Sequence, residues 1–100
     1  MKPLTYQDWE ETLNAHQLVL VDFFAPWCGP CAMMRPVLER AEADYPAVLF
    51  ASVNVDEEED LAVENDISLL PTLVLYRGGE EIQRIVGTLT PEQLRAKLKV

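Results

Sequence analysis

The sequence predicts a single α/β domain over residues 1–100, with a central mixed β-sheet of four to five strands flanked by four helices. Two observations support this class. Short apolar runs typical of strands buried on both faces alternate with segments whose apolar residues recur at helical spacing. The pair Gly78-Gly79 separates the last two strand-like runs as a hairpin turn would. The early βαβ order therefore requires a parallel pair, and the closing hairpin adds an antiparallel one.

The first half of the chain contains the elements of the βαβ unit. Residues Lys2–Leu4 are expected to add a very short edge strand. Thr5 stands at an N-cap position and Asp8 three residues later, a combination that favours a helix start. The apolar run Leu18–Phe24 indicates a buried strand. In the helix that follows, Pro36 is expected to cause a kink, because proline lacks the N–H that would bond one turn back.

The second half supplies three more strands and two helices. Val48–Val55 and Thr72–Tyr76 are apolar runs that predict strands, and Glu81–Val86 follows the glycine pair as the second arm of a hairpin. The acidic run Asp56–Asp60 is expected to open a short helix, because carboxylates are favoured at the positive end of the helix dipole. The last helix begins after Thr90, which is followed by Pro and then Gln at positions that favour a helix start.

Charge and hydropathy exclude several classes of partner. Eight Lys and Arg residues against 17 Asp and Glu residues give a formal net charge of −9. Nucleic acids and anionic membranes attract basic surfaces, so we expect neither as a partner. No apolar run reaches the roughly 18 residues of a membrane span. The first residues also lack the apolar core of a secretory signal, and we therefore expect a cytoplasmic location.

Cys28 and Cys31 are the only cysteines, and they lie where a predicted strand gives way to a helix. A helix N-terminus favours a thiolate at Cys28, because unpaired N–H groups and the positive end of the dipole lie nearby. Cys31 is one turn further on, close enough to form a disulfide. Between them, Gly29 leaves room for an approaching chain and Pro30 stiffens the turn. The pair is therefore interpreted as redox-active.

Two other interpretations of the cysteine pair stay open at this point. The pair could be inert and buried, or it could be half of a structural zinc site. Such a site needs about four ligands, and the single histidine of the chain, His16, lies well before the motif. We expect neither a bound metal nor a bound cofactor.

Asp22 is unusual because both faces of its predicted strand are apolar, which leaves its carboxylate no wet side. A buried carboxylate has a raised pKa. The functional interpretation is a proton acceptor and donor for Cys31, acting through a water molecule. The alternatives are a carboxylate that backbone donors satisfy, or one at a frayed strand end.

Near these residues the sequence resembles the thioredoxin family. The resemblance covers almost the whole chain, and its Trp-Cys-Gly-Pro-Cys core is highly specific. It rests on Asp22-Phe23-Phe24-Ala25-Pro26-Trp27-Cys28-Gly29-Pro30-Cys31, then Pro36, Leu70-Pro71-Thr72 and Val86-Gly87. The fold that it implies is the thioredoxin fold, with a central mixed sheet and a very short first strand.

The resemblance also assigns roles to individual residues. It implies that Cys28 attacks the target disulfide, that Cys31 resolves the intermediate and that Asp22 is the buried acid. It makes Pro71 a cis-proline facing the disulfide, although from the residues alone Pro71 could simply begin a strand. The residues expected to receive the substrate are Trp27, Gly29, Pro30, Leu70, Pro71, Val86 and Gly87.

The function implied is general reduction of protein disulfides by dithiol–disulfide exchange. The partners implied are disulfide-containing proteins and an NADPH-dependent thioredoxin reductase that recycles the oxidised chain, and we expect a monomer. Two rivals remain: a binding module whose redox pair is incidental, and an exported oxidase or isomerase. Gly and Pro between the cysteines favour the reductant over the exported enzymes.

Five positions depart from the family pattern. Ala32, Ser52 and Ser68 stand where the family usually carries basic residues. Leu69 stands where a small residue is usual, and Phe24 where Trp is common. We therefore expect the chemistry to be retained, with an altered choice of partner and altered tuning of the titratable groups.

Overall fold

Five strands form one sheet in the computed structural model, which describes all residues 1–100. Their order across the sheet is β1-β3-β2-β4-β5. β3 is parallel to β1 and β2, whereas β4 is antiparallel to β2 and β5. The strands are β1 (Lys2–Pro3), β2 (Leu18–Phe24), β3 (Val48–Asn54), β4 (Thr72–Arg77) and β5 (Glu80–Val86). This mixed sheet confirms the predicted fold class.

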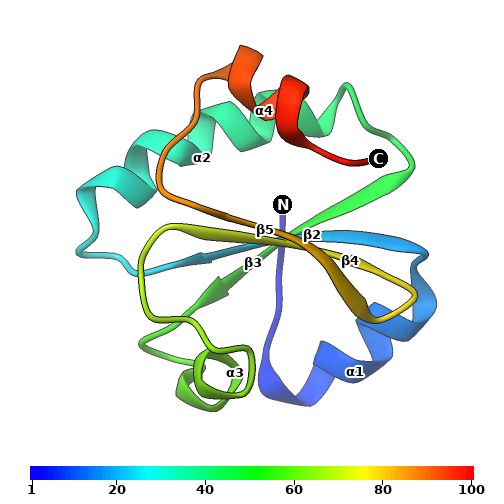
Figure 1. Cartoon of the computed structure of the whole chain (residues 1–100). Helices are drawn as coiled ribbons and strands as arrows, with labels where there is room; N and C mark the ends of the chain where they lie inside the picture. The colour runs from blue at the N-terminus through cyan, green and yellow to red at the C-terminus, as the bar shows by residue number, and fades with distance from the viewer.

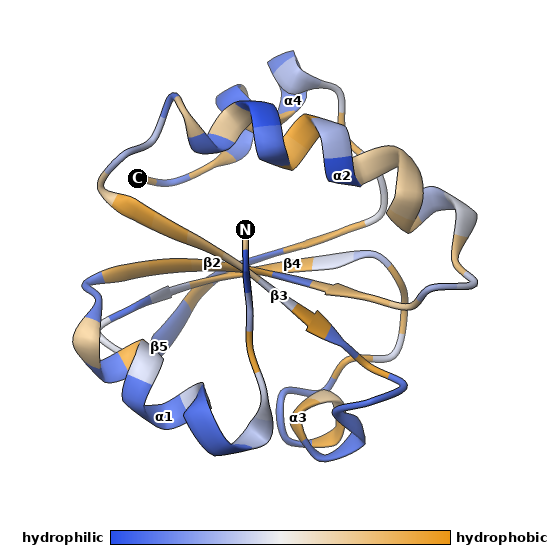
Figure 2. Ribbon diagram, turned by 180° about the vertical axis from the view of Figure 1, so that it is seen from behind, coloured by the Kyte–Doolittle hydropathy of each residue, from blue (hydrophilic) through white to orange (hydrophobic).

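Four helices cover the two faces of the sheet. Helices α1 and α3 lie on one face, and α2 and α4 lie on the other (Figure 1). Their bounds are α1 (Tyr6–Ala15), α2 (Gly29–Glu42), α3 (Glu59–Glu64) and α4 (Pro91–Lys97). Figure 2 shows strongly apolar stretches on the strands and mostly polar residues on α1. No helix has both the length and the apolar character that crossing a bilayer requires.

The helix starts largely follow local sequence chemistry. Thr5 and Asp8 form a reciprocal capping box at α1, and Thr90 forms another with the residue three positions on at α4. Helix α3 begins at Glu59, later than the acidic run suggests, because the Asn54 side chain first accepts the N–H groups of the next turn. Helix α2 runs through Pro36 without ending there.

The alternation of side chains along β2 divides the core into two layers. Val21 and Phe23 are fully buried in the layer beneath α1 and α3. Leu20 points to the opposite face, where it packs in the cluster that includes Leu38 of α2. Successive side chains of a strand point to opposite faces, so Asp22 lies on the face of Leu20. The sheet therefore places an ionisable group beneath α2.

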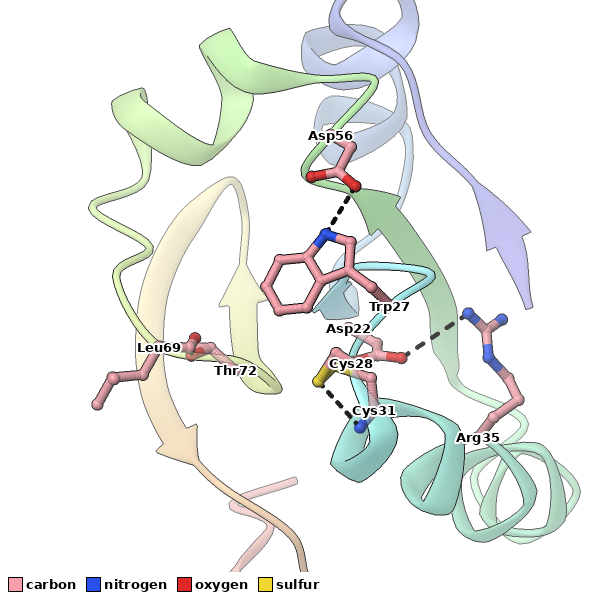
Figure 3. Close-up of a disulfide and its surroundings, with 8 residues drawn as sticks. All are labelled: Asp22, Trp27, Cys28, Cys31, Arg35, Asp56, Leu69 and Thr72. Atoms are coloured by element: carbon pink, nitrogen blue, oxygen red, sulfur yellow. Dashed lines mark hydrogen bonds and ion pairs between the residues drawn. A yellow bond between two sulfur atoms is a disulfide. The ribbon is translucent and has the colours of Figure 1, made fainter.

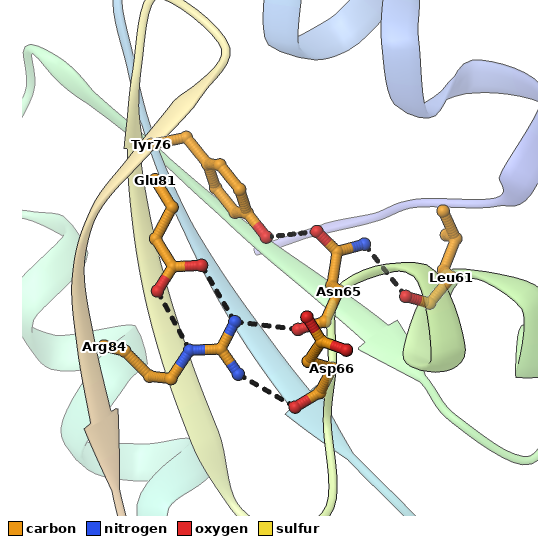
Figure 4. Close-up of polar contacts among 6 residues, drawn as sticks. All are labelled: Leu61, Asn65, Asp66, Tyr76, Glu81 and Arg84. Carbon is orange, nitrogen blue, oxygen red and sulfur yellow. Dashed lines mark hydrogen bonds and ion pairs between the residues drawn. The ribbon is translucent and has the colours of Figure 1, made fainter.

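A polar network fastens the segment between α3 and β4 to the hairpin (Figure 4). The Arg84 guanidinium donates to both carboxylate oxygens of Glu81, at 2.9 and 2.8 Å, and this bond lowers the pKa of Glu81. It also donates to the carbonyl oxygens of Asn65 and Asp66, at 2.7 and 3.0 Å. The Tyr76 hydroxyl donates to the Asn65 side chain at 2.7 Å. These bonds hold the segment around Asn65 and Asp66, which leads into β4, against the hairpin.

Candidate active site

Cys28 is the N-cap residue of α2, and a disulfide joins it to Cys31 (Figure 3). The Cα atoms of the two residues are 5.2 Å apart. The backbone N–H of Cys31 donates to Cys28 Sγ over 3.2 Å. A donor at the first turn of a helix stabilises negative charge on the sulfur that it contacts. The structure therefore places Cys28 at the helix N-terminus that the sequence predicts.

The two sulfurs differ in what they face. Both residues are buried, with 7% of Cys28 and 4% of Cys31 exposed. Cys28 lines an open groove of about 870 Å³, whereas Cys31 does not. A second cavity of about 300 Å³ touches both cysteines and extends to Arg35 on the other side of the pair. Of the two cysteines, only Cys28 is therefore reached from the groove.

The groove contains most of the residues that the sequence singled out for substrate. Trp27, Gly29, Pro30 and Leu70 line it together with Cys28. The Trp27 side chain is 72% exposed.

The indole N–H of Trp27 donates to Asp56 Oδ2 at 2.9 Å (Figure 3). This bond fixes the ring as one wall of the groove. Asp56 was not predicted from the sequence as a site residue, because the acidic run to which it belongs was interpreted only as a helix start.

Pro71, Val86 and Gly87 lie beside the groove without lining it. The Leu70–Pro71 peptide bond is cis, in the conformation that the resemblance implies. Gly87 donates its N–H to the Pro71 carbonyl at 2.9 Å, and its φ of +96° suits glycine. Val86 pairs with Thr72 across the hairpin and is half exposed. The loop before β4 and the loop after β5 are thus joined beside the groove.

Asp22 is deeply buried, with 1% of its surface exposed. It pairs in register with Ser52 on one side and Leu73 on the other, so it is not at a frayed strand end. Neither carboxylate oxygen has a hydrogen-bond partner, so backbone donors do not satisfy it. Burial raises the pKa of Asp22 to about 6, and nearby Arg35 lowers it in part. This carboxyl can accept or release a proton close to neutral pH.

Arg35 is a second site residue that was not predicted from the sequence. Its Nη2 atom is 4.0 Å from Asp22 Oδ2, and its guanidinium lies 4.8 Å from the centroid of the Phe24 ring. Ser52, where the family usually has a basic residue, is buried opposite Asp22 and carries no charge. The cation nearest this carboxylate therefore comes from α2 and not from the position of Ser52. The available signal was helical spacing, since Arg35 follows Cys31 by one turn.

The two cysteines have no further residues around them that would complete a metal site. No group of three or more His, Cys, Asp or Glu side chains in the molecule is arranged so that it could hold a metal ion. The geometry instead brings together a disulfide at a helix N-terminus, an open apolar groove and a buried carboxyl.

Comparison with known proteins agrees with this arrangement. The family model described as Thioredoxin matches residues 1–100. A thioredoxin of Alicyclobacillus acidocaldarius is 43% identical over 96 residues, which cover 95% of this chain and 91% of the relative. Thioredoxin-1 of Saccharomyces cerevisiae is 40% identical over 83 residues, covering 83% of this chain and 81% of the relative.

Solved structures give the same result. The structure of Plasmodium falciparum thioredoxin has a TM-score of 0.90 at 30% identity, and that of Fasciola hepatica thioredoxin has 0.89 at 37% identity. Each comparison covers 96% of this chain and 94% of the other.

We expect Asp22→Asn to increase the free energy of unfolding of the oxidised protein by about 1–3 kcal/mol at neutral pH. The folded-state pKa of about 6 lies above the ordinary value of 3.8. The folded state therefore binds the proton more tightly, and the wild type loses stability as pH rises toward the folded pKa. Urea unfolding between about pH 5 and pH 8 should show the advantage of the variant growing up to about pH 6 and then levelling. A pH-independent difference would contradict this account.

We expect Arg35→Gln to raise the pKa of Asp22 further, because the guanidinium that favours the carboxylate is removed. The shift should be about half a unit to one unit, since Arg35 is partly exposed to solvent. Carboxyl NMR titration of the oxidised protein measures it directly. Arg40→Gln is the matched control, because Arg40 lies on the same helix and makes no ion pair. Equal shifts in the two variants would show that Arg35 acts only through net charge.

Proposed function

Since the chain belongs to the thioredoxin family and is a protein-disulfide oxidoreductase, we propose that Cys28 is its attacking cysteine and Cys31 its resolving cysteine. The observation that carries this assignment is the position of Cys28 Sγ. It accepts the Cys31 N–H at the start of α2, and Cys28 alone of the two lines the groove. A sulfur that is both stabilised as a thiolate and accessible is the better nucleophile.

The reaction begins from the dithiol form of the chain. The Cys28 thiolate attacks one sulfur of the target disulfide, so that a new S–S bond forms between chain and target. The other target sulfur leaves as a thiolate and takes up a proton. At this stage the two proteins are joined through Cys28.

The second step releases the target. Cys31 loses its proton, and its thiolate attacks Cys28 Sγ to form the Cys28–Cys31 disulfide seen in the structure. The second target sulfur leaves as a thiolate and is protonated, so two electrons have passed to the target. We propose that Asp22 accepts the Cys31 proton through water, with Arg35 as a positioning residue that favours its charged form. The pKa of about 6 suits this exchange near neutral pH.

The groove positions the target for attack. Trp27, Leu70 and Pro30 would pack against the target chain, and Gly29 leaves the approach to Cys28 open, since nothing lies within 4 Å of an added Cβ. Pro71, Val86 and Gly87 would contact the target where the two loops meet. These contacts would align a target sulfur with Cys28 Sγ.

The oxidised chain must be reduced again, and the family implies a reductase as the partner. We propose that this partner is an NADPH-dependent flavoprotein, that the chain acts as a monomer, and that it works in the cytoplasm. The cytoplasm is kept reducing by thiol systems, which suits a disulfide reductant. A relative from Schizosaccharomyces pombe is named as mitochondrial, so cell fractionation is the direct test of location.

Cys28→Ser should abolish reduction of insulin above the rate with dithiothreitol alone. Cys31→Ser should instead accumulate a mixed disulfide, because its Cys28 can attack but nothing resolves the product. Turbidity of precipitating insulin measures the first effect, and intact mass spectrometry of the trapped complex measures the second. Trapping of target by Cys28→Ser through Cys31 would reverse the assignment.

Oxidation of NADPH by a thioredoxin reductase of standard specificity should be slow with this chain and faster with Ala32→Lys combined with Ser68→Arg. Both substitutions restore cations where the family usually has them, and rim charges act mainly on the association rate. We expect kcat/KM to rise about threefold to tenfold at low salt and less at high salt. The control adds the same charge at the far end of the sheet, as Asn14→Lys with Gln17→Lys. An equal rise in the control would show that only net charge matters.

A further inference from the structure

The groove beside Cys28 has an exposed apolar wall. Leu69 is 62% exposed and Val63 is 76% exposed, and both line the groove. Ala62, the neighbour of Val63 in sequence, and Ile67 line it too. Exposed aliphatic side chains that gather around one hollow mark a binding surface more often than a random scatter does.

The charge of the same groove has one sign. Asp56 and Glu59 are its only charged lining residues, and neither makes an ion pair. A shallow hollow next to it is lined by Tyr6 and the acidic run Asp56–Asp60, so the negative surface continues beyond the groove.

No cation from elsewhere compensates these carboxylates. Arg84 holds Glu81 on the hairpin, and Arg35 lies against Asp22 on the far side of the disulfide. The segment that follows α3 carries Ser68 in the groove lining, where a basic residue is usual in the family. The groove is therefore both apolar and electrostatically negative.

We propose that this groove selects target segments that carry a large aliphatic side chain and a lysine or arginine close to the reactive cysteine. The aliphatic side chain would pack between Leu69 and Val63, and the cation would face Asp56 and Glu59. This inference rests on the proposed attack by Cys28, and it adds the class of target that the attack favours.

A second copy of the chain is a poorer occupant of the groove. Each copy carries a net charge of −9, so two copies would repel at long range. A basic, apolar segment of a different protein satisfies both features of the groove at once.

The test uses four short peptides that carry one cysteine, flanked by Leu or Ser on one side and by Lys or Glu on the other. Each cysteine is blocked as a mixed disulfide with the same chromogenic thiol. Stopped-flow absorbance gives the second-order rate constant for reaction with the reduced protein. Each rate constant is divided by the rate constant for the reaction of the same peptide with dithiothreitol, because a flanking Lys also changes the intrinsic reactivity of the peptide disulfide.

The Leu and Lys peptide should react fastest. Exchanging Lys for Glu should slow the reaction about threefold to tenfold at low salt, and added salt should shrink the difference. Exchanging Leu for Ser should slow it about threefold to tenfold at any salt.

Matched variants locate the effect in the groove. Glu59→Lys should abolish or reverse the preference for Lys, whereas Glu80→Lys, at the far end of the sheet, should keep it although the net charge is the same. Glu59→Gln is a milder second variant, which should reduce the preference for Lys without reversing it. Leu69→Ser should abolish the preference for Leu, and Ile82→Ser, another exposed aliphatic position outside the groove, should not.

The outcomes separate this inference from the proposed function. Equal rates for the four peptides, or equal effects of Glu59→Lys and Glu80→Lys, would overturn the selectivity while Cys28 still reacts. Wild-type protein that reacts with none of the peptides faster than Cys28→Ser does would instead overturn the proposed attack by Cys28. Concentration-dependent self-association that Glu59→Lys abolishes would make a second copy the occupant and overturn the proposed target class.

Discussion

The pairing of β2 along both of its edges is the constraint on which the site depends. β3 runs parallel to β2 on one side and β4 antiparallel on the other. Because β4 is antiparallel, its first residue lies beside the last residues of β2, with Thr72 in register with Phe23. The cis-proline before Thr72 is therefore delivered to the end of the strand from which Cys28 emerges. The register between β2 and β4 thus brings Pro71 near Cys28, although they are more than 40 positions apart in the sequence.

The same strand determines the electrostatics beneath the disulfide. Asp22 lies on a strand that is paired along both edges, so its carboxylate is shielded from bulk solvent and the pKa rises to about 6. An isolated buried charge is costly, and the nearest cation approaches only to 4.0 Å. That cation is Arg35, which stays partly in solvent and is shared with the Phe24 ring. The arrangement leaves the carboxyl poised for proton transfer rather than fixed in a strong ion pair.

Positive charge is unevenly distributed around the active face. It is absent at Ser52 and Ser68, where the family usually has it, and present at Arg35, on the side of the disulfide away from the groove. The groove itself keeps only the carboxylates of Asp56 and Glu59. Charge on the buried side acts on proton transfer within the chain. Charge on the groove side acts on which partner approaches, because exposed charges steer association.

The sequence by itself determined the elements and the reactive pair, because those depend on neighbours along the chain. The apolar run of β2 matched the observed strand, Thr5 and Thr90 marked helix starts, and two residues between the cysteines put them one helical turn apart. Burial of Asp22 also followed locally, because its neighbours on both strand faces are apolar. The late start of α3 was not predicted from the sequence, because the Asn54 side chain accepts the N–H groups of Asp56 and Glu57 and forms a turn before the helix.

Only the tertiary structure decided what surrounds the site. The approach of Arg35 to Asp22 depends on α2 crossing over β2, and the bond from Trp27 to Asp56 joins residues 29 positions apart. The shape of the groove depends on which side chains of α3 and of the loop before β4 reach the same space. The physical reason is that packing and Coulomb forces act through space. Residue order fixes secondary structure and spacing, but the crossing of elements fixes which distant groups meet.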